Sequence, residues 1–274
     1  MTTDVRSPAR SAVEWTGSAG NGGQGAGAMN KVARVTLVFW IMKMCATTLG
    51  ESAWEHAAAL PAGFAQRAAL LVVASVLLLA WQFRGDRFHP VRYWLVVLAT
   101  GAIAAMAADA MGRGAWPGYA GGSLLLAAAL GATLGLWLRV KGSVAPETVT
   151  DPRSEAFYWT AIVLANALGT GIADGFASAS SLGLGTEVVL VGGLVAVVVL
   201  AAYFTHFDLA VLFWIAIVFT RPFGATFGDF LSSPNEAGGL DLGTARTALV
   251  QAVLLVAFLV YSRAEDARLR RAGG

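Results

Sequence analysis

The chain of 274 residues is 57% hydrophobic and only 13% charged, and its mean hydropathy is +0.64. A soluble domain carries about 25% charged residues, so this composition excludes an ordinary soluble fold and predicts a polytopic membrane protein. The net charge of +2 does not indicate nucleic acid as a partner. The single cysteine, Cys45, lies in an apolar run and excludes an internal disulfide framework and a cysteine-based zinc site.

The first 30 residues contain a glycine-rich tract, TGSAGNGGQGAGA. Such a tract has too little apolar surface to offset the entropy of ordering, so we expect residues 1–30 to form a disordered cytoplasmic tail. They lack the apolar core of a secretory signal peptide, and Met29 is an alternative start.

Eight apolar segments follow, each close to the roughly twenty residues that cross a hydrocarbon layer of about 30 Å. They come in pairs: Val32–Trp54 and Arg67–Phe83, Val91–Met111 and Gly121–Leu138, Ala156–Phe176 and Glu187–Phe204, Leu209–Phe230 and Thr244–Ser262. We therefore expect an all-α transmembrane domain of eight helices over residues 31–262. A basic cytoplasmic tail, residues 263–274, follows it.

An internal repeat runs through the first member of each pair. An aromatic residue precedes a tryptophan, and an acid follows that tryptophan after fifteen residues: Trp40 and Glu55, Trp94 and Asp109, Trp159 and Asp174, Trp214 and Asp229. This pattern indicates a fourfold tandem array, with repeats at about 31–84, 90–140, 154–205 and 208–262. Because each repeat holds two spans, successive copies enter the membrane from the same side and are parallel repeats about an axis along the membrane normal.

Basic residues beside the spans gather on the side of the two termini, and only Arg67, Arg113 and Arg246 lie on the other side. Connections rich in Lys and Arg stay in the cytoplasm, so we expect both termini there. The helices that carry the tryptophan and the acid, here called motif helices, then hold their acids about 22 Å farther out than their tryptophans.

The helical period places the polar residues of each motif helix on one face. Residues 7, 11 and 15 positions after the tryptophan lie at about −20°, +20° and +60° from it. The four faces are Trp40, Thr47, Glu51 and Glu55; Trp94, Gly101, Ala105 and Asp109; Trp159, Asn166, Thr170 and Asp174; and Trp214, Arg221, Ala225 and Asp229. An ionisable side chain in hydrocarbon costs at least about 2.5 to 3.5 kcal/mol, so we expect these faces to surround a pseudo-symmetric polar axis, with the four other helices outside.

Small residues and a proline lie beside these faces. Gly50, Gly169, Gly224 and Gly228 permit close backbone approach or local unwinding. Pro222 follows Arg221, and we expect it to free a backbone carbonyl and to kink the fourth motif helix.

The axis is predicted to be acidic. Its carboxyl groups are those of Glu51, Glu55, Asp109, Asp174 and Asp229. Only Lys43 and Arg221 oppose them, so five acids against two cations leave a charge of −3 when all are ionised. Such a site attracts a cation or holds protons, and its oxygen ligands suit Mn²⁺ or Mg²⁺. We predict the five acids as metal ligands, supported by Lys43, Thr47, Asn166, Thr170 and Arg221.

Three segments, VTLVFWIMKMCATTLGES, EAFYWTAIVLANALGTGIAD and VLFWIAIVFTRPFGATFGD, resemble the repeats of a bacterial integral membrane family catalogued as a repeat of unknown function. The resemblance covers about residues 31–262 and implies four tandem copies of two transmembrane segments, each with a tryptophan. It also implies a location in the bacterial inner membrane. The second repeat departs most, since Ala104 and Ala105 stand where the third has Gly169 and Thr170.

The residues themselves leave several functions open. The first is a secondary transporter, a proton-coupled exporter of a divalent metal, whose partners are the bilayer, the cation and protons. The second is a structural or sensory membrane protein in which Lys43 and Arg221 form buried ion pairs and the tryptophans form an interfacial belt. The third, an intramembrane enzyme, lacks support because neither GxSxG nor HExxH occurs. No pattern indicates a bound cofactor or an oligomeric state.

Overall fold

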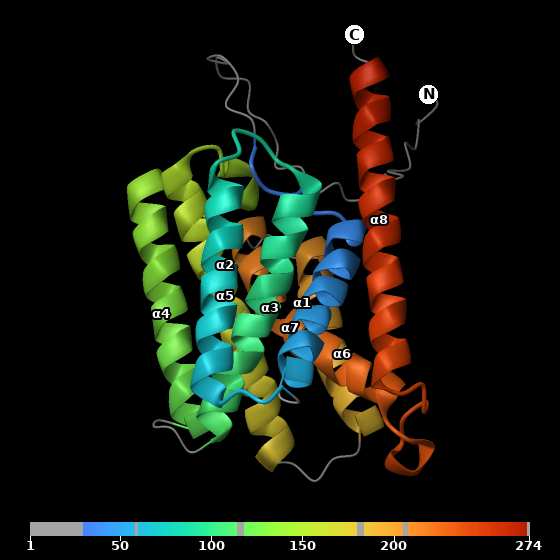
Figure 1. The fold of residues 1–274 in the computed structure, drawn as a ribbon. Coiled ribbons are helices and arrows are strands. Elements are labelled where there is room, and N and C mark those ends of the chain that lie inside the picture. The colour runs from blue at the N-terminus through green and yellow to red at the C-terminus, as the bar shows by residue number, and fades with distance from the viewer. Residues whose placement is uncertain (1–29, 58–59, 114–117, 180–183, 205–207, 273–274) are drawn as a thin grey trace, which may run out of the picture.

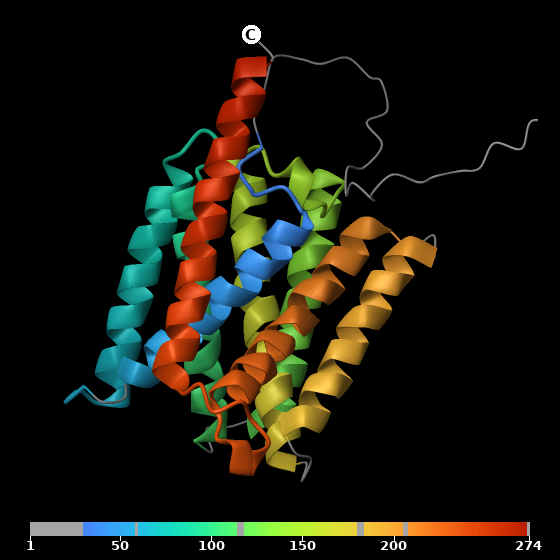
Figure 2. The same cartoon turned by 90° about the vertical axis from the view of Figure 1, so that its right-hand side faces the viewer.

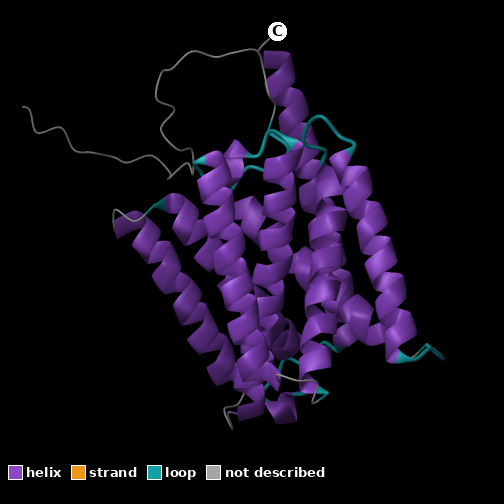
Figure 3. Cartoon of the chain, turned by 90° about the vertical axis from the view of Figure 1, so that its left-hand side faces the viewer, coloured by secondary structure: helices purple, strands orange, loops and turns teal. Residues whose placement is uncertain are grey.

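The computed structural model describes residues 30–57, 60–113, 118–179, 184–204 and 208–272 (Figure 1). The expected tail at residues 1–30 and the alternative start at Met29 therefore fall almost wholly outside the described residues. Within these ranges the fold is all-helical, and helices joined by loops run up and down one bundle, with no strand among them (Figure 3).

The helices coincide with the eight expected spans. They are α1 (Leu37–Ala57), α2 (Phe64–Phe83), α3 (Pro90–Gly112), α4 (Gly118–Lys141), α5 (Pro152–Ala179), α6 (Leu184–Phe204), α7 (Leu209–Ser232) and α8 (Thr244–Ala272). Two short 3-10 helices, η1 (Pro146–Thr148) and η2 (Asn235–Ala237), lie in connections. We call the end of the bundle that holds the start of α1 and the end of α8 the terminal face, and the other end the opposite face (Figure 1).

Three boundaries differ from the expected ones by four residues or more. The largest difference is at the end of α8, which continues to Ala272, beyond the expected end at Ser262 and through most of the expected basic tail at residues 263–274. The other two differ for local reasons. Helix α5 begins at Pro152, before the expected Ala156, because the carboxylate of Asp151 accepts hydrogen bonds from the backbone N–H groups of Arg153 and Ser154. An aspartate cap followed by proline is a strong helix start. Helix α1 begins at Leu37, after the expected Val32, because the preceding segment is tied across the terminal face by the hydrogen bond from Lys31 N to Val149 O.

Among the described residues, six helices are long and apolar enough to cross a membrane: α2, α3, α4, α5, α7 and the Thr244–Tyr261 part of α8. Helix α1 is more polar because it carries Lys43, Glu51 and Glu55. The apolar part of α6 in the described residues is Gly185–Val198. The chain is thus a multi-pass membrane protein.

The motif helices α1, α3, α5 and α7 form the centre of the bundle. Helix α1 packs on α3, α3 on α5, α5 on α7, and α7 again on α1. The even-numbered helices lie outside them, with α2 against α3, α4 against α5, α6 against α7 and α8 against α1. Figure 2 places α2 and α6 at opposite edges of the bundle. Of the residues in the candidate membrane spans, 50% are buried in α3 and 61% in α5 and in α7, whereas 0% are buried in α2. The motif helices therefore make the centre of the bundle.

Glycines set the spacing between the central helices. A Cβ added at Gly50 of α1 would lie 2.0 Å from the carbonyl oxygen of Leu98 in α3, and one added at Gly101 would lie 2.3 Å from the carbonyl oxygen of Thr47. Between α5 and α7, a Cβ added at Gly169 would lie 2.4 Å from the carbonyl oxygen of Val218. Pro222 has no N–H to donate to that carbonyl, and α7 continues through it as a helix. The expected close backbone approach is confirmed at Gly50 and Gly169, whereas the atoms nearest to Gly224 and Gly228 belong to the side chain of Thr48.

Candidate functional site

All five predicted acids line one cavity. The cavity has a volume of about 450 Å³ and lies at the opposite-face ends of the motif helices, where it is bordered by Glu51, Glu55, Asp109, Asp174 and Asp229. Residues far apart in the sequence meet here because the fifteen-residue spacing brings each acid to the same end of its helix. Three uncharged residues of the predicted polar faces also line the wall: Ala105, Thr170 and Ala225.

The acids differ in depth. Glu55 and Asp229 are exposed at the mouth, whereas Asp109 and Asp174 are partly buried. Asp109 is paired with Arg113 of its own helix, at 3.1 Å between carboxylate and guanidinium. The side chain of Glu51, about one turn deeper than Glu55, is only 15% exposed. The cavity therefore grades from solvent at the opposite face to a buried floor.

The floor is an ion pair between α1 and α7. Nη1 of Arg221 donates a hydrogen bond of 2.8 Å to Oε2 of Glu51, and the Arg221 side chain is 0% exposed. Within the described part of the chain, Nε and Nη2 of Arg221 have no hydrogen-bond partner. An isolated charge of this kind is costly to bury, so the pair fixes Glu51 as the counter-ion of Arg221.

Lys43 lies away from the cavity wall. It is buried, and its Nζ donates hydrogen bonds to the carbonyl oxygen of Ile217 at 3.0 Å and to Oγ1 of Thr220 at 2.9 Å. Both acceptors belong to α7. Lys43 thus joins α1 to α7 on the terminal side of Arg221, and the structure does not bring it into contact with the five acids.

The predicted supporting residues are buried and hydrogen-bonded. Nδ2 of Asn166 donates to Oγ1 of Thr100 in α3 at 3.0 Å, which links the second and third motif helices. The hydroxyl groups of Thr47 and Thr170 donate to backbone carbonyls of their own helices, those of Lys43 and Asn166. Of these three residues, only Thr170 also lines the cavity.

The tryptophans form a closed ring inside the bundle, on the terminal side of the cavity. The aromatic residue before each tryptophan packs against the tryptophan of the next motif helix, with these distances between ring centroids: Phe39–Trp94 5.8 Å, Tyr93–Trp159 5.2 Å, Tyr158–Trp214 6.0 Å and Phe213–Trp40 5.7 Å. Trp94, Trp159 and Trp214 are buried. The interpretation of these three as an interfacial belt facing lipid is therefore wrong.

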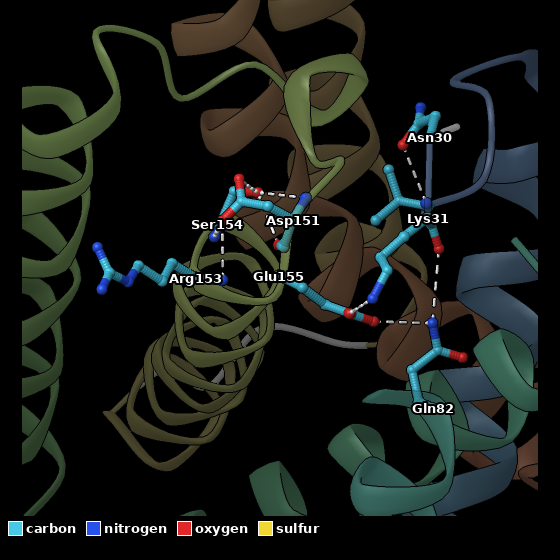
Figure 4. Close-up of polar contacts among 8 residues, drawn as sticks. Asn30, Lys31, Gln82, Asp151, Arg153, Ser154 and Glu155 are labelled. Carbon is cyan, nitrogen blue, oxygen red and sulfur yellow. Dashed lines mark hydrogen bonds and ion pairs between the residues drawn. The ribbon is translucent and has the colours of Figure 1, made fainter. Parts of the chain in front are cut away.

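A buried polar network that was not predicted from the sequence lies at the terminal face (Figure 4). Nζ of Lys31 lies 2.9 Å from Oε2 of Glu155, whose Oε1 accepts a hydrogen bond of 3.0 Å from Nε2 of Gln82. All three side chains are buried, and they come from the segment before α1, from α5 and from α2. The available signal was Glu155 in the first turn of a capped helix, where an acid is favoured by the helix dipole.

The outer helices also contribute to the cavity, although the sequence predicted them as mostly apolar helices outside the polar axis. Helix α8 presents Thr244, Thr247 and Gln251, and α4 presents Tyr119. The α8 residues are separated by three and four positions, a spacing that puts them on one helical face, and that pattern would have revealed them.

The five acids lie around the cavity rather than in a tight cluster. Among the described residues, no group of three or more His, Cys, Asp or Glu side chains is close enough to hold a metal ion. A cation in the cavity therefore meets dispersed carboxylates in this conformation. The predicted charge balance also changes, because Arg67 and Arg113 line the cavity and Lys43 does not.

Comparison with known protein families gives a match to part of the chain. The family described as Repeat of Unknown Function (DUF347) matches residues 157–207 and 212–266, which correspond to the third and fourth predicted repeats. Comparisons with curated proteins and with solved structures give no match.

Proposed function

We propose that this chain, a multi-pass membrane protein that contains two copies of the DUF347 repeat, is a secondary transporter that exports a divalent cation of the Mn²⁺ type in exchange for protons. One observation carries the proposal. Acids from all four motif helices line a single cavity that reaches the interior of the bundle and ends at a buried ion pair. Ionisable groups inside a membrane protein are costly and characteristic of ion pathways.

We further propose that all eight helices cross the bacterial inner membrane, with both termini in the cytoplasm and four parallel repeats around one axis. The cyclic packing of the motif helices supports this arrangement, as does the aromatic contact that each motif helix makes with the next. In this orientation the cavity opens to the outside.

The mechanism we propose is alternating access. In the outward-open form the aromatic ring and the Lys31–Glu155 pair close the cytoplasmic side. Protons entering from outside neutralise the carboxylates, and the protein then closes the cavity and opens the terminal face. Loss of the protons to the cytoplasm frees the carboxylates for the metal. Because the acids are dispersed in the outward-open form, they must approach one another in the other form to coordinate the cation.

The test is flux into proteoliposomes that contain the purified full chain. A Mn²⁺-sensitive dye and a pH dye would be read together, with Mg²⁺, Zn²⁺ and Co²⁺ as parallel cargoes. We expect coupled movement of Mn²⁺ and protons in opposite directions. Asp174→Asn should abolish this flux while the protein still inserts, because the variant loses an ionisable carboxyl group that lines the cavity. Glu147→Gln, an acid-to-amide change at an exposed position of η1, is the matched control and should leave flux unchanged.

A non-transporting structural or sensory role is the alternative, and the buried pairs Lys31–Glu155 and Arg221–Glu51 favour it because they join separate segments. It predicts that no metal of the panel moves in wild-type proteoliposomes and that a deletion strain keeps the metal content of its parent. That pair of results would rule out the transporter.

A further inference from the structure

A second hollow lies on the outer surface of the bundle, far from the acidic cavity. It is a groove of about 550 Å³ between α4 and α5. Its walls are mainly small or apolar: Ala132, Thr133 and Leu136 of α4, and Ala156, Phe157 and Thr160 of α5. Leu136 is 54% exposed, so the groove faces the surroundings of the bundle rather than its interior.

The groove exists because several residues at the contact between α4 and α5 have small side chains, which do not fill the space between the two helices. Ala132, Ala156 and Thr160 leave the space, and a Cβ added at the neighbouring Gly135 would touch nothing within 4 Å. The position of Phe157 in the groove wall is fixed, because its ring stacks on that of the fully buried Trp137 with the ring planes 7° apart. The hollow is thus a built feature and does not depend on a flexible side chain.

One end of the groove is basic. Val140 and Arg153 line that end, at the terminal face, and Arg139 and Lys141 flank Val140. Arg153 is exposed, and Figure 4 shows its side chain extending away from α5. Its backbone N–H caps the helix through Asp151, whereas its guanidinium forms no hydrogen bond or ion pair with the described residues. Lys141, in contrast, is paired with Asp151 at 2.8 Å.

We propose that this groove is a binding site for an anionic phospholipid, with the phosphate at Arg153 and an acyl chain along α4 and α5. The polarity of the groove matches that of the lipid, because the exposed guanidinium of Arg153 lies at the level of the loops and the apolar part of the groove runs from it into the spanning region. Guanidinium groups bind phosphate through paired N–H donors. Basic residues beside a span favour anionic headgroups, whose leaflet we expect on the same side as the termini.

The experiment is native mass spectrometry of the full chain in detergent, titrated with phosphatidylglycerol, phosphatidylethanolamine or phosphatidylcholine. We expect phosphatidylglycerol to give a saturable adduct and the two zwitterionic lipids to give weaker ones. Arg153→Gln removes the cation, and Ala156→Leu fills the groove without removing charge. Arg153→Gln should weaken phosphatidylglycerol binding about fivefold, the effect of one basic residue at a membrane surface. Ala156→Leu should weaken it as well, because the larger side chain occupies the space of the acyl chain.

The control is Arg87→Gln, which removes an exposed cation from the α2–α3 connection at the same face and should leave binding unchanged. Equal losses for Arg87→Gln and Arg153→Gln would show a general charge effect and overturn the proposal. Unchanged binding in Ala156→Leu, or equal competition by inorganic phosphate alone, would overturn it as well, because a chain-binding groove requires both. Size-exclusion elution of each variant checks the fold, and no part of the test depends on the transported ion.

Discussion

Arg221 and Glu51 are the two residues on which the cavity floor depends. Glu51→Gln would leave the guanidinium of Arg221, which is 0% exposed, without its counter-ion. Breaking one partner of a buried ion pair costs about 3 to 5 kcal/mol, and we expect the lower value because Glu51 borders the cavity. Thermal unfolding of the purified variant in detergent measures the loss.

Two further variants separate the ion pair from the general effect of losing an acid. Glu55→Gln changes an exposed acid at the mouth and should alter the unfolding temperature little. The double variant Glu51→Gln with Arg221→Gln removes both charges and should recover part of the stability. Equal unfolding temperatures for Glu51→Gln and Glu55→Gln would contradict the assignment of Glu51 to the floor.

Two lysine–carboxylate pairs at the terminal face offer a matched comparison. The Glu155 side chain is 0% exposed, whereas those of Lys141 and Asp151 are 30% and 38% exposed. Glu155→Gln should therefore destabilise the protein by about 3 to 5 kcal/mol, since it leaves Lys31 buried without a counter-ion. Lys141→Gln should cost about 1 kcal/mol or less, because exposed pairs contribute little. Chemical unfolding of both variants under one condition decides the comparison, and similar losses would refute it.

At the scale of elements, the contact of α1 with α3 depends on residues without side chains. Gly50→Ala would place a methyl carbon 2.0 Å from a carbonyl oxygen, which forces the two helices apart. Overpacking of this kind costs about 1 to 3 kcal/mol. Gly131→Ala in α4 is the control, because the added carbon meets nothing within 4 Å and alanine is the better helix former.

Unfolding temperatures of these two variants should move in opposite directions. Gly50→Ala should lower the temperature, and Gly131→Ala should leave it unchanged or raise it slightly. A neutral Gly50→Ala would mean that α1 and α3 are less closely packed than described.

The helices could be predicted from sequence because their signal is local. Twenty apolar residues in a row predict a span, and the period of the motif helices put Asp174 and Asp229 at the same end as Glu55. The partners of the polar residues could not be predicted, because hydrogen bonds such as that from Lys43 to Ile217 join segments 174 residues apart. The Lys31–Glu155 pair was missed for the same reason, since it brings a segment before the first helix to the start of the fifth.

For the whole molecule, the cavity predicts that water reaches the interior of the bundle from the opposite face. In a Cys45→Ser background, Ala225→Cys places a thiol on the cavity wall, and Ala216→Cys places one at a buried position of the same helix nearer the terminal face. A membrane-impermeant maleimide added to intact cells should label Ala225→Cys, if the opposite face is outside, and should leave Ala216→Cys unmodified.

Labelling of inverted vesicles provides the complement. We expect neither thiol to react quickly there, because the aromatic ring lies between the terminal face and the cavity. Faster reaction of Ala225→Cys in inverted vesicles than in cells would reverse the proposed orientation. Equal reaction of the two cysteines would contradict the closed terminal side.

The aromatic ring has no first or last member. Each motif helix offers one aromatic residue to its successor and accepts one from its predecessor, and Phe213 returns the series to Trp40. A polypeptide with only two consecutive repeats would leave two aromatic side chains without their ring contacts. These would be the tryptophan of its first motif helix and the residue before the tryptophan of its second. Two such half-length polypeptides would supply each other's missing aromatic contacts. Head-to-tail contacts of this type form a closed ring when the rotation between the subunits closes. Co-expression of residues 30–145 and 146–274 as separate chains should therefore yield an associated pair.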